Sequence, residues 1–347
     1  MRYLICQEWS NTSNNHAGMK HMCNLLKAYY PDEYETIIFP DIYKNLSTIS
    51  FVRRIQIRLI KEIVIPYKYL KIGKELSNQL NDGDSIYLLE YCGSLFPQLS
   101  IAKYLRNLPL NIKIYGLVHL VPQKIEESFT QNQLVNCLKP LDYVMTLGSS
   151  LSNFFVQKVG VQSSKVKTVF HYVDLEYYKP LVNYLEKKDS PPSVLVMGNQ
   201  KRNFTLLYKI VEDNPEIQFT ICQGVMDLSD QFKNCNNVQL VGFVEEEELL
   251  GIMQRSDISL NIMEDTIGSN VITTSMAVGM AIVVSNVGSI KDYCKEDGAI
   301  YCENEDASSF SQALKQLMTD QNKLQFLKRK SIKYSKNLTI ANLHKSF

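Results

Sequence analysis

The sequence predicts an α/β protein built from two doubly wound domains, each a parallel sheet covered by helices on both faces, that face each other across a cleft. Short apolar runs alternate with helical patterns along the whole chain. Strands that are apolar on both faces are typical of parallel sheets. The alternation is interrupted by the polar segment 182–192, which contains EKKDSPP, and then restarts. A chain of 347 residues is also long for one domain.

The composition favours a globular protein without a metal. The formal net charge of +1 provides no general attraction to nucleic acid, and the hydrophobic fraction of 45% is ordinary. No apolar run approaches the ~20 residues of a membrane-spanning helix, and YLIC after Met1 is more typical of a first strand than of a signal peptide. The eight cysteines form no C-x-x-C pair and no zinc-type spacing. We therefore expect reduced cysteines and a cytoplasmic location.

The first domain is expected over residues 1–181. Between its strands lie amphipathic stretches with helical spacing of apolar residues, such as Ala17–Tyr29, Leu99–Leu105 and Leu151–Val159. The strand candidates are short apolar runs: Tyr3–Cys6, Thr36–Phe39, Ile86–Glu90, Ile112–His119, Tyr143–Leu147 and Val166–His171.

The second domain is expected over residues 193–329. The segment Ala307–Lys336 has a helical pattern, and we expect the C-terminal helix, about 330–347, to pack back on the first domain. The strand candidates are Val194–Met197, Gln218–Cys222, Val238–Val241, Ile258–Ile262, Ala281–Val287 and Ala299–Tyr301.

The segment Gly268–Cys294 is the most informative part of the second domain. It predicts a polar loop, a helix over Asn270–Val278 that stops at Gly279, a strand over Ala281–Val287 and a helix starting at Ser289. Gly-Ser-Asn directly before a helix offers backbone N–H groups and the positive end of the helix dipole, which suit a diphosphate. The alternative is an ordinary N-capped helix.

Four segments in order resemble the C-terminal domain of GT-B glycosyltransferases, specifically the retaining enzymes of glycosyltransferase family 4: VLVMGN (194–199), VQLVGFV (238–244), ELLGIMQRSDISLNIM (248–263) and TSMAVGMAIVVSNVGSIKDYC (274–294). In the first half, HYVDLEYYKP (171–180) and NHAGM (15–19) also resemble family segments. The resemblance covers nearly the whole chain. It implies two Rossmann-like domains, with the acceptor on the first and the nucleotide-sugar donor on the second.

The resemblance also implies the reaction: transfer of a sugar, with retention, from a nucleotide diphosphate sugar to a glycan or lipid-linked glycan, in polysaccharide or glycolipid synthesis. It implies no metal and no cofactor. The D-x-D at Asp82-Gly83-Asp84 precedes a strand and indicates a turn. A cation must then offset charge on the leaving diphosphate, and Lys201 and Arg202, which follow a strand end, are the candidates. The alternative for this pair is a solvated surface position.

The remaining site residues follow from the same resemblance. His119, at the end of an apolar strand, is expected to contact the donor sugar as a catalytic residue, although a structural role is the alternative. His21 is expected to be a surface or interface residue, and His171 is expected to be structural. Asn15, His16 and Glu90 are expected to bind acceptor. The region after Phe219–Cys222 and the backbone near Gly242 are expected to bind the base. The donor-binding residues are Gly18, Gly198, Asn199, Phe243, Val244, Glu264, Gly268, Ser269, Asn270, Val271 and Thr274.

The sequence departs from the family at its pair of glutamates. The matching positions are Thr266 and Thr274, which can hydrogen-bond a hydroxyl but carry no charge. Glu264 and Asp265, directly upstream, could replace the first glutamate. The departure keeps two other classes open: a GT-B nucleotide-sugar epimerase, which would need an acid/base set, and a degenerate transferase-like scaffold without activity.

A basic stretch runs from Lys44 to Lys74, with eight Lys and Arg against the single acid Glu62 and with apolar residues interleaved. This pattern predicts amphipathic helices that could rest on anionic lipid at the inner face of the membrane, each basic residue contributing about 1 kcal/mol. The alternative is a helix packed on the sheet with a solvated basic face.

Overall fold

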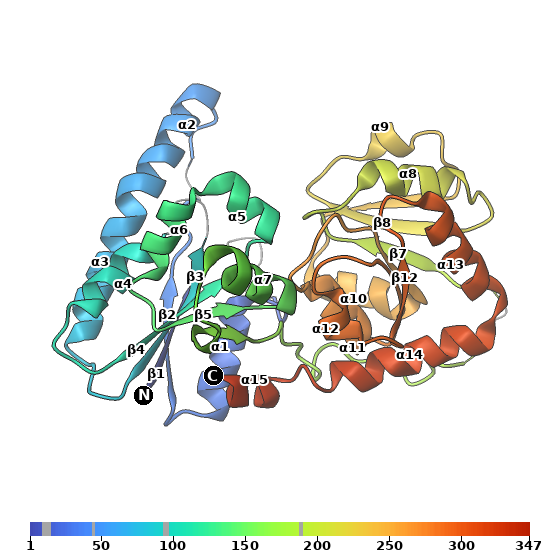
Figure 1. Cartoon of the computed structure of the whole chain (residues 1–347). Helices are drawn as coiled ribbons and strands as arrows, with labels where there is room; N and C mark the ends of the chain where they lie inside the picture. Colours follow the sequence, from blue (N-terminus) through green and yellow to red (C-terminus); the bar gives the residue numbers. More distant parts are fainter. Residues whose placement is uncertain (9–14, 44–45, 93–96, 187–189) are drawn as a thin grey trace. The chain divides into compact units, whose positions relative to one another are not determined.

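The computed structural model describes residues 1–8, 15–43, 46–92, 97–186 and 190–347. Lys44 of the basic stretch and residues 187–189 of the predicted linker lie outside these described residues. The chain divides into two compact units, Met1–Phe170 and His171–Phe347 (Figure 1). Each unit is a parallel sheet with helices packed around it, as the sequence predicts.

The first unit contains a six-stranded sheet in the order β2-β1-β3-β4-β5-β6, and all of its strand pairs are parallel. The order reverses between β1 and β3, which is where a doubly wound sheet binds its ligands. The strands are β1 (Arg2–Gln7), β2 (Tyr34–Phe39), β3 (Ser85–Cys92), β4 (Lys113–Val118), β5 (Tyr143–Thr146) and β6 (Val166–Thr168).

Helices connect these strands and include two π-helical turns. Helices α3 and α4 pack closely because Gly73 has no side chain: a Cβ there would lie 3.1 Å from both Ile101 Cγ1 and Tyr104 Cδ1. The helical elements are α1 (Met19–Tyr29), α2 (Ser50–Leu59), η1 (Ile60–Val64), α3 (Ile65–Ser77), α4 (Leu99–Arg106), α5 (Pro122–Ser128), α6 (Gln131–Leu138), α7 (Ser149–Phe154), η2 (Phe155–Val159) and the 3₁₀ turn η3 (Ser163–Lys165).

The second unit contains a six-stranded parallel sheet in the order β12-β11-β10-β7-β8-β9. This is the Rossmann order, and its switch point lies between β7 and β10. The strands are β7 (Val194–Met197), β8 (Phe219–Gly224), β9 (Val238–Gly242), β10 (Ile258–Asn261), β11 (Ala281–Ser285) and β12 (Ala299–Cys302).

The helices of the second unit pack on both faces of its sheet. One core joins Ile258 and Leu260 of β10 to α8, α13 and α14. Ser259 points to the other face, where its Oγ lies 2.9 Å from Ser275 Oγ of α11. The helices are α8 (Phe204–Glu212), α9 (Ser229–Phe232), α10 (Glu246–Arg255), α11 (Asn270–Ala277), α12 (Ile290–Cys294), α13 (Ala307–Thr319), α14 (Gln321–Ser335) and α15 (Ile340–Ser346).

Every strand expected from the sequence is present, and the differences lie at boundaries. The last strand of the first unit stops at Thr168, and β3 continues past Glu90 to Cys92. The predicted helix 151–159 is α7 followed by a π-helical turn. The helical segment 307–336 is divided at Asp320, whose side chain accepts the Lys323 N–H and caps α14. Residues 330–347 likewise form two helices, because Thr339 caps α15.

The segment 171–181 contacts the second unit. The Val173 N–H donates to Leu338 O at 2.8 Å, and Tyr178 Oη donates to Glu246 Oε1 at 2.6 Å. The boundary between the two units, after Phe170, therefore lies before the predicted linker at 182–192. Packing of the C-terminal helix on the first domain stays a prediction. None of the described helices is long and apolar enough to cross a membrane, and all eight cysteines are free.

Candidate functional site

Two loops meet at the switch point of the second sheet, beyond the carboxyl ends of β7 and β10. Backbone hydrogen bonds join them: Glu264 N donates to Lys201 O at 3.0 Å, and Asn203 N donates to Ile262 O at 3.2 Å. Between these bonds Arg202 forms an antiparallel bridge with Met263. The loop after β7 is thus fixed against the loop that leads to α11, and the position of Arg202 is fixed with it.

Arg202 is a half-buried residue whose guanidinium is partly enclosed by the protein. Its Nε and Nη1 atoms are buried and have no hydrogen-bond partner among the described residues. Burial lowers the pKa of Arg202 to about 10, so the guanidinium remains charged at neutral pH. A buried charge without a partner is costly, and nearby anions relieve the cost. The side chain therefore has the properties of a group that binds an anion.

The guanidinium lies beside the first turn of α11. A Cβ placed on Gly198, whose φ is +82°, would lie 3.3 Å from Arg202 Nη2 and 3.0 Å from Val271 Cγ2. Ser269 precedes the helix with extended backbone, and its side chain makes no capping hydrogen bond. The first N–H groups of a helix have no acceptor within the helix, and the dipole makes this end positive. Arg202, Gly198 and the start of α11 thus lie together and place positive charge at one point, which suits a phosphate group.

Gly268 contributes a turn to this site rather than a free donor. Its φ is +124°, which L-residues rarely adopt. Its N–H already donates to Thr266 Oγ1 at 3.1 Å. Of the predicted Gly-Ser-Asn donors, the Gly268 N–H is therefore already used within the loop. Helix α11 begins after it, at Asn270.

The two threonines at the glutamate positions are both buried and engaged. Thr266 Oγ1 accepts the Gly268 N–H, and its carbonyl accepts the Ser289 N–H at 2.8 Å. The Thr274 hydroxyl donates to Asn270 O at 2.7 Å, within its own helix. Each hydroxyl thus makes a hydrogen bond within the local structure, and neither carries the charge of a carboxylate.

Lys201 and Arg202 differ in spite of being neighbours. Lys201 adopts φ of +50°, and its Nζ lies 3.7 Å from Glu264 Oε2. The Glu264 side chain is half exposed. Asp265 Oδ1 accepts the N–H of Thr266 at 2.7 Å. Glu264, rather than Asp265, is therefore the carboxylate that remains accessible near the site.

The other donor candidates lie at the ends of β7, β8 and β9. Asn199 Nδ2 donates to Gln223 O at 3.1 Å, which joins the loop after β7 to the end of β8. The side chain of Phe243 is 55% exposed, directly after β9, and Val244 is half-buried. An exposed aromatic ring at this sheet edge offers a surface on which a flat base can stack.

The first-unit candidates lie near the carboxyl edge of their own sheet. His119 follows β4 and precedes α5. Gly18 has an ordinary φ of −81° as the residue before α1, and its N–H donates to Asn15 O at 2.8 Å. The His16 ring lies 4.2 Å from the His21 ring, so these two histidines are neighbours.

Glu90 lies inside β3, and its N–H donates to Gln98 Oε1 at 2.9 Å. Gln98 is fully buried, and its Nε2 also donates to Ile5 O and Tyr69 Oη, both at 3.3 Å. This side chain joins β1, β3 and α3 close to the switch point of the first sheet. No sequence pattern indicated Gln98, because a single glutamine directly before a helix is not typical of any kind of site.

Two further residues of the second unit were also missed. Asn261 is fully buried at the end of β10, and its Oδ1 has no hydrogen-bond partner among the described residues. A polar residue in the apolar run ISLNIM was the available signal. Tyr293 of α12 packs against Gly268, and only the tertiary structure brings these residues together.

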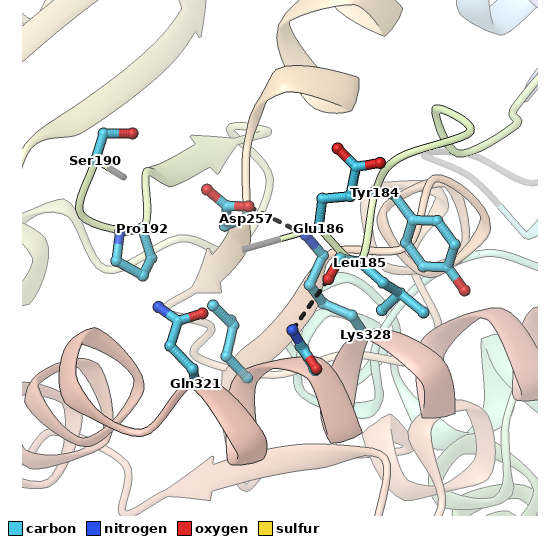
Figure 2. Close-up of a pocket in the computed structure, with 10 residues that line it drawn as sticks. Tyr184, Leu185, Glu186, Ser190, Pro192, Asp257, Gln321 and Lys328 are labelled. Carbon is cyan, nitrogen blue, oxygen red and sulfur yellow. Dashed lines mark hydrogen bonds and ion pairs between the residues drawn. The ribbon is translucent and has the colours of Figure 1, made fainter. Parts of the chain in front are cut away.

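A small pocket lies at the opposite end of the second sheet (Figure 2). It is lined by the buried Lys328 of α14 and by Asp257, which precedes β10, and these two form an ion pair at 3.1 Å. Its volume of about 10 Å³ has room for about one water molecule. Because it lies at the amino ends of the strands, it is separate from the switch-point site.

Comparison with protein families gives a match within the second unit. Residues 194–320 match the family model for glycosyl transferases group 1. This range contains Gly198, Arg202 and the start of α11. A comparison with curated proteins gives no match.

Solved structures match over nearly the whole chain. Sucrose-phosphate synthase from Thermosynechococcus elongatus has a TM-score of 0.75 at 14% identity, covering 99% of this chain and 96% of that one. HepE from Anabaena in complex with UDP has a TM-score of 0.74 at 12% identity, covering 99% and 98%. A glycosyltransferase from Rickettsia africae has a TM-score of 0.68 at 11% identity, covering 99% and 95%. Residues 194–320 are thus similar to glycosyl transferases group 1, and the chain as a whole has the two-domain α/β fold of the GT-B glycosyltransferases.

Proposed function

We propose that the protein is a retaining glycosyltransferase whose donor is a nucleotide diphosphate sugar, with the diphosphate bound between Arg202 and the start of α11. The observation that carries this proposal is the guanidinium of Arg202, whose Nε and Nη1 are buried and have no hydrogen-bond partner in the part of the chain that the structure describes. A diphosphate would supply the missing anion and acceptors. HepE, which shares the fold, was crystallised with UDP and with UDP-glucose, which supports a nucleotide-sugar ligand.

The proposed chemistry follows from these positions. The bond between the sugar anomeric carbon and the diphosphate oxygen breaks while the acceptor hydroxyl oxygen bonds to the same face of that carbon. The acceptor proton moves to the departing diphosphate oxygen. Arg202 and the helix dipole stabilise the negative charge that builds on the diphosphate, and interactions that strengthen in this way lower the barrier. No metal is assigned a role. The Nζ of Lys201 lies 3.7 Å from Glu264 Oε2.

The remaining roles are proposed by position. His119 contacts the donor sugar, and Asn15, His16 and Glu90 bind a glycan acceptor. Phe243 and Val244 lie against the base. The reaction belongs to the synthesis of polysaccharide or glycolipid. We propose no cofactor.

Calorimetric titration with UDP, after a thermal-shift screen of nucleoside diphosphates, tests the donor site. Loss of Arg202 in an Arg202→Ala variant should weaken binding by about a hundredfold, because a charge-assisted pair to phosphate is lost. Arg255→Ala is the matched control, since Arg255 ends α10 at the other end of the sheet. Equal affinity in wild type and Arg202→Ala would refute the site.

A wild-type protein that binds no nucleotide would instead indicate a scaffold, which the engaged Thr266 and Thr274 make the main competing function. If the protein binds and turns over a nucleotide sugar, the products separate transfer from epimerisation. Transfer requires an acceptor, whereas an epimerase would change the free nucleotide sugar without one.

We further propose that helix α2 rests on an anionic membrane, which would bring the protein to a lipid-linked acceptor at the inner membrane face. Figure 1 shows α2 extending away from the sheet of the first unit. None of its residues is buried. Phe51, Ile55 and Leu59 recur every four residues, so they share one side of the helix, and they are 72%, 45% and 49% exposed.

Arginines accompany this apolar stripe. Arg54 and Arg58 are exposed and lie four residues apart, and Arg53 is exposed beside them. The helix continues through η1 into α3, which buries Ile65 and Tyr69 and so anchors the exposed part to the unit. Apolar and basic side chains on an anchored, otherwise unpacked helix suit a surface with acyl chains and negative headgroups.

Co-sedimentation with vesicles containing phosphatidylglycerol tests this contact. Changing Arg53, Arg54 and Arg58 to Glu should reduce the bound fraction at least tenfold, since each basic residue contributes about 1 kcal/mol. The matched control changes Arg329, Lys333 and Lys336 on and after α14, all exposed, with the same change in charge. Equal loss in both triple variants, or none in the α2 variant, would refute a specific role of α2.

A further inference from the structure

The loop that leads into α11 also contacts the segment Gly288–Tyr293. Two contacts lie at the start of this segment. Ser289 N donates to Thr266 O at 2.8 Å. A Cβ on Gly288, whose φ is +54°, would lie 2.0 Å from Thr266 O, so the two backbones are in close contact. The carbonyl group of Thr266 is therefore held by backbone atoms of Gly288 and Ser289.

Tyr293 makes the third contact, on the helix side of the loop. A Cβ on Gly268 would lie 2.3 Å from Tyr293 Oη, so the hydroxyl lies directly against the backbone of the turn. Tyr293 is 2% exposed. Its Oη also accepts the His171 N–H at 3.0 Å. Burial raises the pKa of Tyr293, which keeps the hydroxyl neutral at physiological pH.

These contacts define the direction in which α11 starts. Gly268 adopts its positive φ between Thr266 Oγ1, which accepts its N–H, and Tyr293 Oη, which blocks movement on the other side. The exposed N–H groups of α11 begin two residues later, beside Arg202. A shift of the turn would therefore move these groups relative to the guanidinium, and anion binding depends on their convergence.

We propose that Tyr293 is a positioning residue for the diphosphate site: its hydroxyl holds the Gly268 turn so that the start of α11 and Arg202 address the same anion, and it joins this turn to the backbone of His171. The proposal rests on the proposed donor site. The ring supports Gly268 through contact, and the hydroxyl orders the turn through its hydrogen bond to His171. Tyr293 itself need not touch the ligand.

Tyr293→Phe removes the hydroxyl and retains the ring. Inorganic pyrophosphate, measured by calorimetry, is the probe, because it contains only the group that the turn is expected to position. We expect the dissociation constant to rise about threefold to tenfold, the effect of losing one hydrogen bond. Hydrogen exchange of residues 264–272 in the ligand-free protein should become faster. Gly268→Ala, whose Cβ would meet Tyr293 Oη, should weaken pyrophosphate binding further.

Tyr301→Phe is the matched control. The Tyr301 hydroxyl also donates to a backbone carbonyl, that of Lys295 directly after α12. This variant should change neither pyrophosphate affinity nor exchange of residues 264–272. Both variants should keep the wild-type circular dichroism spectrum.

The outcomes separate this proposal from the donor site. Unchanged exchange and affinity in Tyr293→Phe would overturn the positioning role, whatever Arg202→Ala shows. A lower melting temperature with unchanged exchange of residues 264–272 would show a purely structural role and also overturn it. If wild-type protein binds neither pyrophosphate nor UDP, the donor site fails, and faster exchange in Tyr293→Phe would then support only the contact with the turn.

Discussion

Two buried cations of the second unit lie at opposite ends of the same sheet and have opposite surroundings. Lys328, at the amino ends of the strands, is 5% exposed and forms an ion pair with Asp257 at 3.1 Å. Asp257 also accepts the N–H and Oγ–H of Ser193, both at 3.1 Å. Arg202, at the carboxyl ends, has two buried nitrogen atoms that no described residue pairs with.

The difference distinguishes a charge that is paired inside the protein from one that we propose to be paired by a ligand. The Lys328 pair joins α14 to the segments that start β7 and β10, and its charges compensate each other inside the protein. The charge of Arg202 is left to be compensated by something that binds. Burial alone therefore does not identify a ligand site; the proposed diphosphate site rests on burial together with the absence of a partner among the described residues, at a switch point.

The largest expected effect comes from removing the compensated charge. Lys328→Met leaves Asp257 buried without its cation, and we expect the free energy of unfolding to fall by about 3–5 kcal/mol. Urea unfolding followed by circular dichroism measures it. Adding Asp257→Asn, which keeps an acceptor for Ser193, should recover part of the loss. A change below about 1 kcal/mol in the single variant would remove the contrast with Arg202.

Removing the uncompensated charge should have the opposite sign. Arg202→Met deletes buried donors that have no partner, so we expect the free energy of unfolding of the ligand-free protein to rise by about 1–3 kcal/mol. The same variant should lose diphosphate binding. Urea unfolding and calorimetry on one preparation check both effects. A destabilised Arg202→Met protein would mean that Arg202 is structural, like Lys328.

Keeping the charge but changing its shape should give an intermediate effect. Arg202→Lys retains a cation but loses the planar fork that can bind two phosphate oxygens at once. We expect UDP affinity to fall about tenfold, less than in Arg202→Ala. An equal loss in the Lys and Ala variants would show that geometry, rather than charge, determines binding.

The smallest effect is expected at Thr274. Its hydroxyl donates to Asn270 O within α11, so Thr274→Val should change UDP affinity by less than about threefold. Calorimetry with UDP and with 2′-deoxy-UDP measures this. A large loss for UDP alone would show that Thr274 replaces the missing glutamate at the ribose after all.

Much of the fold follows from local pattern, and the sequence predicts it. The runs that became β7 and β10 are apolar and short, which is what a sheet covered on both faces requires. Boundaries are harder to predict, because a single capping side chain such as Asp320 divides a helix whose apolar pattern continues across it. The resemblance agrees with the match of residues 194–320 to the family model for glycosyl transferases group 1.

The individual site residues were less accessible to sequence reasoning. Arg202 was a candidate because it follows a strand end, but Lys201 was equally so. Only the bridge to Met263 and the burial of the guanidinium distinguish the two. Tyr293 carried no signal at all, because its contact with Gly268 joins residues 25 positions apart, on different elements.

The sequence by itself determined the two α/β units, the order of their strands and helices along the chain, and the glycine-containing loop before α11. These depend on the periodicity of apolar residues and on local turn and cap chemistry, which are readable along the chain. The tertiary structure decided which cation lacks a partner, how the Gly268 turn is held, and where Thr266 and Thr274 direct their hydroxyls. Those properties depend on distances between segments remote in sequence, because desolvation and hydrogen-bond satisfaction are set by every neighbour in space.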